Sequence, residues 1–137
     1  MTDAGGLEFH HVGVACIDIR AEAGRMASLG YTPEGVEFSD IRQGVRGLFL
    51  GGQSPRLELL QPLDGAAPGV LTPWLKNGVK MYHIGYQTCA LIDAIERVRA
   101  SGGKLIVPPV AAVAFAGREI AFVMLPNRLL IELIATK

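Results

Sequence analysis

The chain has 137 residues, which is enough for one ordinary domain that buries its own hydrophobic core. Thirteen lysine and arginine residues balance thirteen aspartate and glutamate residues, so no net charge favours nucleic acid or an anionic membrane as a partner. No apolar run is long enough to span a bilayer, and the two cysteines form no CxxC pair and indicate no disulfide framework. These features predict a soluble, cytoplasmic protein.

The first half of the chain predicts one β-α-β-β-β unit. Residues 9–15 are rich in β-forming types and are followed by a helical pattern, which is typical of a strand. Apolar residues near helical spacing predict a helix over 17–29, and Gly30 suits its C-terminal end. Three more strands are expected over residues 32–38, 45–51 and 56–61.

The same order of elements recurs in the second half. The pattern there predicts a strand, a helix and three strands over residues 80–86, 91–100, 104–107, 118–125 and 129–135. His11 and His83 are 72 residues apart, and so are Gly30 and Gly102, which indicates an internal repeat. Residues 62–78, rich in Pro, Gly and Ala, are expected to join the halves. We therefore expect residues 1–137 to form a single domain of two half-modules, about 7–63 and 79–136.

Each predicted module carries one histidine on its first strand and one glutamate on its last. These residues are His11 with Glu58, and His83 with Glu132. A single strand histidine is more often a core or surface residue than a ligand, and a single strand glutamate usually points to solvent. Both glutamates, however, stand in apolar strand sequence, where a carboxylate removed from water costs several kcal/mol unless it is compensated. Their recurrence at repeat-equivalent positions therefore predicts one metal site with four ligands.

The ligand types limit which metal such a site would take. Two imidazoles and two carboxylates without a thiolate suit a divalent ion of Ni, Co, Mn, Fe or Zn. His10 competes with His11 for the role of ligand, but adjacent strand residues face opposite ways. The repeat selects His11, because His83 aligns with it while Tyr82 aligns with His10.

These motifs resemble a known superfamily over nearly the whole chain, from about Leu7 to Thr136. The duplicated βαβββ pattern, the His-Val-Gly-Val-Ala and His-Ile-Gly strands, and the Leu-Glu-Leu and Ile-Glu-Leu strands look like the vicinal oxygen chelate superfamily. That superfamily includes glyoxalase I, methylmalonyl-CoA epimerase, extradiol dioxygenases and bleomycin-resistance proteins. The resemblance implies an α+β fold in which two tandem βαβββ modules form a curved mixed sheet around a metal site, and it suggests a homodimer.

Within the superfamily, two branches are most similar. Residues 43–46 and the run from 59–63 into 74–75 and 82–84 look like the epimerase branch, whereas the His, Glu, His, Glu ligand order resembles bacterial glyoxalase I. Both branches imply that a divalent metal binds two neighbouring substrate oxygens and that a carboxylate moves a proton at carbon. Glu132 and Glu58 would then be ligands and catalytic groups, and His11 and His83 ligands only. A metal-free binding or antibiotic-resistance module is the alternative, and an extradiol-type dioxygenase is a further one.

Three departures from the relatives concern the substrate. Gly47 stands where some epimerases carry an acidic residue, and the last hairpin, at 125–128, is short. Residues 108–116 are almost wholly apolar. They are expected either to pack against the other half-module or a second subunit, or to line a pocket for a hydrophobic substrate group. Side chains that would line such a pocket are Gln43, Trp74, Tyr82, Phe115 and Arg118.

Overall fold

The computed structural model describes residues 6–63 and 69–137, and the chain divides into two compact units. The first unit comprises His11–Tyr82, and the second comprises His83–Lys137 together with the residues up to His10. The division falls within two strands, β1 (Glu8–Ala15) and β5 (Met81–Thr88). Each unit is a βαβββ module with four strands and its own covering helix.

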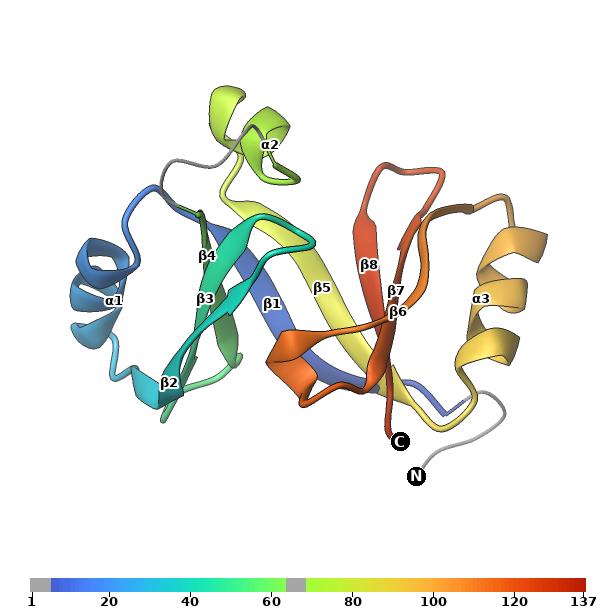
Figure 1. Cartoon of the computed structure of the whole chain (residues 1–137), viewed down its shortest axis with the longest axis horizontal. Helices are drawn as coiled ribbons and strands as arrows, with labels where there is room; N and C mark the ends of the chain where they lie inside the picture. Colours follow the sequence, from blue (N-terminus) through green and yellow to red (C-terminus); the bar gives the residue numbers. More distant parts are fainter. Residues whose placement is uncertain (1–5, 64–68) are drawn as a thin grey trace. The chain divides into compact units, whose positions relative to one another are not determined.

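In the first unit, a mixed four-stranded sheet carries one helix on a face (Figure 1). Its strands lie in the order β2 (Thr32–Asp40), β3 (Val45–Gly51), β4 (Leu57–Pro62) and β1. The pairing of β1 with β4 is parallel and the other pairings are antiparallel. The parallel pair is possible because α1 (Ile19–Ala27) returns the chain after β1, as parallel strands require a crossover.

The helix α1 begins at a polar cap and ends at a glycine. The Asp18 carboxylate accepts hydrogen bonds from the backbone N–H groups of Arg20 and Ala21, at 3.0 and 3.2 Å. Gly30 follows the helix with a φ of 99°, which favours glycine over residues that carry a Cβ. Beneath α1, the core consists of Cys16, Ile19, Tyr31, Leu48, Leu50, Leu57 and Leu59.

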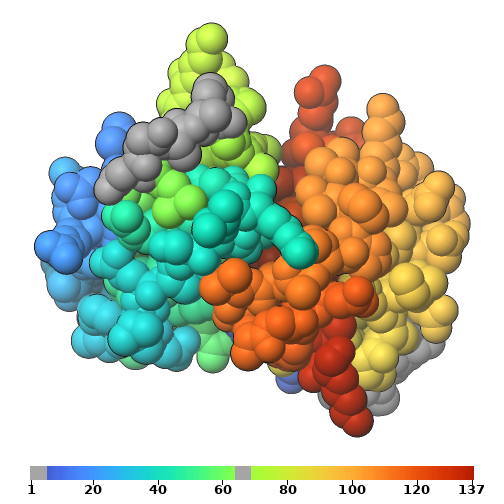
Figure 2. Space-filling model, in the orientation of Figure 1, coloured from blue at the N-terminus to red at the C-terminus, as the bar shows by residue number. Residues whose placement is uncertain are grey.

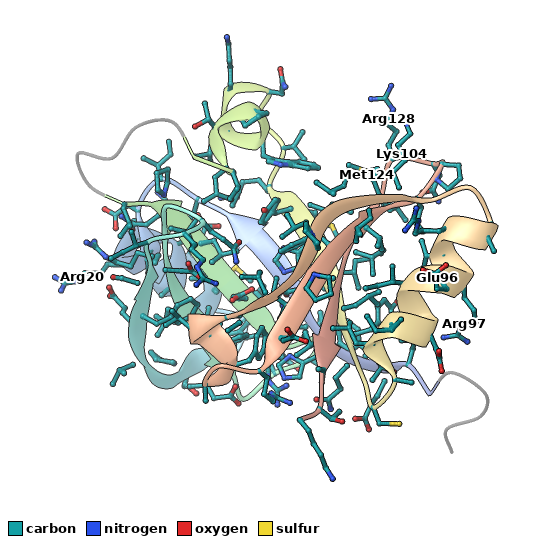
Figure 3. All side chains as sticks on the ribbon, turned by 45° about the vertical axis from the view of Figure 1, so that its right-hand side comes forward. Arg20, Glu96, Arg97, Lys104, Met124 and Arg128 are labelled. Atoms are coloured by element: carbon teal, nitrogen blue, oxygen red, sulfur yellow. The ribbon has the colours of Figure 1, made fainter. Side chains whose placement is uncertain are left out.

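The second unit repeats this arrangement with different side chains. Its sheet order is β5, β8 (Leu130–Ala135), β7 (Glu119–Met124) and β6 (Lys104–Ala111). Again β5 and β8 are parallel and the other pairings are antiparallel. Helix α3 (Leu91–Ala100) packs its apolar stripe on the sheet, while Glu96 and Arg97 extend from its exposed side (Figure 3). The core under α3 contains Leu91, Ala94, Ile95, Ala121, Val123, Ile131 and Leu133.

The α+β class and the tandem βαβββ modules with mixed strand pairing are confirmed, and the structure adds detail at two places. The joining segment 62–78 contains a short helix, α2 (Thr72–Lys76); its residues 64–68 lie outside the described part of the chain. The strand expected over 104–107 continues through Pro108 and Pro109 to Ala111, and a 3₁₀ turn, η1 (Val113–Phe115), follows it. Strand β6 lies at the sheet edge and at the surface (Figure 2), where one side of a strand needs no partner for its N–H groups. None of the helices in the described ranges has the length and apolar character needed to cross a membrane.

Candidate metal centre

In the first unit, the sheet face opposite α1 carries a histidine and a glutamate. Leu59 belongs to the core under α1, so its neighbour Glu58 points to the other face, because strand side chains alternate. Glu58 is paired with Gly13 of β1 in the strand register. His11 lies two residues before Gly13 on the same strand and therefore shares the face with Glu58.

These two side chains form a buried pair. His11 Nε2 lies 3.1 Å from Glu58 Oε1, which is hydrogen-bond distance. His11 is 0% exposed and Glu58 is 4% exposed. The ring of Phe49, which is directly opposite Glu58 in the strand register, meets the imidazole edge to face with centroids 5.5 Å apart. A carboxylate in such surroundings requires a proton donor or a cation, because water is excluded.

The second unit builds the same pair from the equivalent strands. His83 Nε2 lies 3.1 Å from Glu132 Oε1, and both residues are buried. Phe122, opposite Glu132 in the register, meets the His83 ring edge to face at 5.3 Å. Each unit thus has one histidine–glutamate pair backed by one phenylalanine, on the sheet face that its helix does not cover.

The composition of the two pairs fits a divalent metal. His11, Glu58, His83 and Glu132 each offer one ligand atom, and all four are buried. These side chains offer nitrogen and oxygen donors and no thiolate, so among the described residues they are the candidates to hold a metal ion. By contrast, the buried carboxylate of Asp40 is compensated without a metal, since its Oδ1 accepts from the backbone N–H of Gln43 at 3.2 Å.

The neighbouring histidine has a different environment. The structure pairs His11 with Glu58, whereas the ring of His10 meets Phe115 edge to face with centroids 5.4 Å apart. Phe115 is 5% exposed, and the Arg118 guanidinium carbon lies 5.5 Å from the centre of its ring. Arg118 also donates to the carbonyl oxygen of Ala135 at 3.3 Å. Phe115 and Arg118 are therefore packed together in the second unit, and their role in a substrate pocket stays a prediction.

The other residues predicted to line a pocket lie in the first unit. Trp74 of α2 and Tyr82 meet edge to face with ring centroids 5.4 Å apart, and Tyr82 is 5% exposed. Gln43 is half-buried in the turn between β2 and β3. Their contact with a substrate also stays a prediction.

Sequence reasoning missed two phenylalanines that contact the histidines of the pairs and a third, Phe38, that contacts one of these two. Phe49 and Phe122 each lie opposite a glutamate, and Phe38 lies opposite Gly47 on the paired strands β2 and β3. A Cβ built on Gly47 would come within 2.2 Å of the Phe38 ring, so this glycine gives room for the ring. A glycine inside a strand pattern was the available signal, because it often marks a close approach by another group.

Comparison with solved structures finds the same fold in several proteins. A hypothetical protein from Bacillus halodurans C-125 is 26% identical, with a TM-score of 0.78 over 96% of this chain and 95% of that chain. A methylmalonyl-CoA epimerase from Mycobacterium tuberculosis shares the fold at 22% identity, with a TM-score of 0.81 over 100% of this chain and 93% of that one. A variant of the Streptomyces coelicolor methylmalonyl-CoA epimerase, in complex with 2-nitronate-propionyl-CoA, is 25% identical, with a TM-score of 0.76 over 93% of each chain. A search of the curated proteins gave no match.

The tandem βαβββ modules define the vicinal oxygen chelate class of proteins. Residues 10–122 match the family model described as the Glyoxalase/Bleomycin resistance protein/Dioxygenase superfamily, and the chain belongs to this superfamily. The resemblance noted from the sequence is therefore confirmed.

Proposed function

We propose that this protein is a metal-dependent isomerase or lyase that moves a proton at a carbon next to a chelated carbonyl group. The observation that carries the proposal is the occurrence of a buried histidine–glutamate pair in each module, with 3.1 Å between nitrogen and oxygen in both. A protein that only binds small apolar molecules has no need to bury two carboxylates.

The proposal assigns all four side chains to one centre. The chain passes from one unit to the other directly before His11 and again directly before His83. Each histidine is therefore covalently adjacent to the other unit, which favours joint use of the two pairs over two separate sites. His11, Glu58, His83 and Glu132 would hold the divalent ion, and the bound ion would supply Lewis-acid chemistry at the carbonyl oxygen.

Proton transfer would then belong to the two glutamates. The Glu132 carboxylate would take the proton from the carbon beside the carbonyl, and Glu58, protonated beforehand from solvent, would give its proton to the substrate from the opposite side. Delivery to the same carbon gives an epimerase, and delivery to the neighbouring carbon gives a glyoxalase-type isomerisation.

Gly47 has no side chain, and the Phe38 ring fills the space beside it, so position 47 offers no third carboxylate. The similar proteins from Mycobacterium tuberculosis and Streptomyces coelicolor are methylmalonyl-CoA epimerases, which supports the epimerase form and a small-molecule thioester as one candidate substrate. We also propose a homodimer, as the superfamily resemblance suggests.

The test separates metal binding from proton transfer. Purified protein should contain or accept stoichiometric Ni, Co, Mn, Zn or Fe by elemental analysis, and the loaded protein should exchange the carbon-bound proton of a 2-substituted acyl thioester or a hemithioacetal in D₂O. Glu132→Gln should lower this exchange by about 100- to 10,000-fold, because a positioned base contributes about that factor. Metal content must be measured in the same samples.

Glu119→Gln is the matched control, since Glu119 is an exposed glutamate on a strand of the same unit. It should leave exchange unchanged. Full exchange activity in metal-loaded Glu132→Gln would refute the base assignment. Absence of metal binding would favour a metal-free binding or resistance module, and oxygen-dependent cleavage of a catechol would favour a dioxygenase.

A further inference from the structure

A row of aromatic rings extends from the His11–Glu58 pair across the first unit's sheet. Directly opposite residues on paired strands share a face, and so do alternate residues along one strand. Phe49 is opposite Glu58, Gly47 lies two residues before Phe49, and Phe38 is opposite Gly47. These residues therefore lie on the face of His11 and Glu58, away from α1.

Ring contacts make the row continuous. The centroids of His11 and Phe49 are 5.5 Å apart, and those of Phe49 and Phe38 are 6.0 Å apart with an angle of 34° between the ring planes. Phe38 is half-buried in a strand whose other residues between Thr32 and Ser39 are exposed, so part of its ring reaches solvent. This strand lies at the edge of the sheet and at the molecular surface (Figure 2).

Gly47 fixes the position of the outer ring. A Cβ at this position would lie 2.2 Å from Phe38 Cζ and within 2.7 Å of two more ring carbons. The Phe38 ring therefore lies directly against the backbone of Gly47. Any side chain there would displace the ring, and the sheet face at this position is apolar.

The second unit lacks the outer part of this row. Phe122 corresponds to Phe49, but the positions corresponding to Gly47 and Phe38 are Ile120 and Val110, which are opposite one another on β7 and β6. The two units therefore present different surfaces beside their equivalent histidine–glutamate pairs. Only the first unit has the flat aromatic surface.

We infer that Phe38 and Phe49 select substrates that carry a flat, apolar substituent, such as an aryl group, beside their chelating oxygens. The inference rests on the proposed function, because it assumes that the substrate binds next to His11 and Glu58. Aromatic rings favour a second ring in edge or offset contact over an alkyl group of similar exposure. The Phe38–Gly47 contact also stabilises the pairing of β2 with β3, so the test must separate selection from folding.

Hydroxamates are suitable probes because their two neighbouring oxygens chelate divalent metals without turnover. Calorimetry on the metal-loaded protein gives the ratio of the benzohydroxamate and acetohydroxamate affinities. Phe38→Leu should lower this ratio about 3- to 10-fold relative to the wild type, the range expected for one lost aromatic contact. The affinity of Phe38→Leu for acetohydroxamate should equal that of the wild type. The two probes differ in their own affinity for the metal, but this difference cancels when the ratio is compared between the variant and the wild type.

Two further variants distinguish a selecting surface from a structural contact. Gly47→Ala retains Phe38 but displaces its ring, so it should also lower the ratio. Val36→Ala, an exposed position on the same strand, should not. If Phe38→Leu fails to fold, fluorine NMR of protein labelled with 4-fluorophenylalanine replaces it. The chain has five phenylalanines, and the Phe38 resonance is the one lost in Phe38→Tyr. This resonance should shift when benzohydroxamate is added and not when acetohydroxamate is added.

The outcomes separate the two proposals. The aromatic selection alone is overturned if the protein binds metal and acetohydroxamate but Phe38→Leu leaves the ratio of the two hydroxamate affinities unchanged. It is also overturned if benzohydroxamate does not shift the Phe38 resonance. Failure of the wild-type protein to bind metal overturns the proposed function and, with it, this inference.

Discussion

The two cysteines show how the environment of a single side chain sets its reactivity. Burial, and to a smaller extent the nearby Glu22 carboxylate, raises the pKa of the Cys16 thiol to about 11, whereas Cys89 is exposed. Because the thiolate is the reacting form, Ellman's reagent at pH 8 should modify Cys89 in the native protein and Cys16 only after unfolding. In Cys89→Ser, no thiol should react quickly until denaturant is added. A rapidly reacting native thiol in that variant would contradict the prediction.

At the same scale, the candidate site was partly accessible from the sequence. The histidine–glutamate pairs were predictable because the repeat provides a second copy of each residue type at an equivalent position. Strand alternation allowed only one of His10 and His11 to face the site, the repeat selected His11, and the structure pairs His11 with Glu58. Phe38 was not predictable, because its place beside Gly47 depends on the register between β2 and β3, and that register shifts between Glu34 and Phe38. Sequence spacing alone cannot count residues across such an irregularity.

Among the elements, α1 depends on its N-terminal cap. The Asp18 carboxylate satisfies two backbone N–H groups that have no partner within the helix. Asp18→Ala should therefore lower the free energy of unfolding by about 0.5 to 2 kcal/mol, measured by urea denaturation. Arg20→Ala is the matched control, since the Arg20 side chain extends away from α1 (Figure 3) and its backbone N–H remains available to Asp18. Equal stability losses in the two variants would argue against the cap.

The elements themselves were predictable where side-chain periodicity is strong. Both β-α-β-β-β orders, the strand Val45–Gly51 and the helix Leu91–Ala100 agree with the sequence patterns. The short helix Thr72–Lys76 was missed because a single helical turn among Pro, Gly and Ala residues shows no period. The extension of β6 was missed because two prolines usually end a strand, yet here they coincide with register shifts at the sheet edge.

For the whole molecule, the decisive quantity is the number of metal ions per chain. If the two pairs form one centre, titration of metal-free protein should end at one ion per chain. Saturation at 100 times the dissociation constant should then stabilise the fold by about 2.7 kcal/mol, because only the folded protein presents the ligands together. His11→Ala and His83→Ala should each weaken binding of the same single ion. Two ions per chain, with one lost in each variant, would show that the pairs act separately.

A mixture of the two histidine variants asks whether one chain supplies the whole centre. Chains with His11→Ala retain the second pair, and chains with His83→Ala retain the first. We expect that mixing them, even after joint refolding, does not restore wild-type affinity, because each proposed centre uses both units of one chain. Recovery of tight binding in about a quarter of the expected sites would instead mean that a centre combines units from two chains. Half of the randomly formed pairs are mixed, and exchanged units reunite all four ligands in one of the two centres of each mixed pair. His11→Ala refolded alone is the control, because no exchange between identical chains can restore its missing ligand.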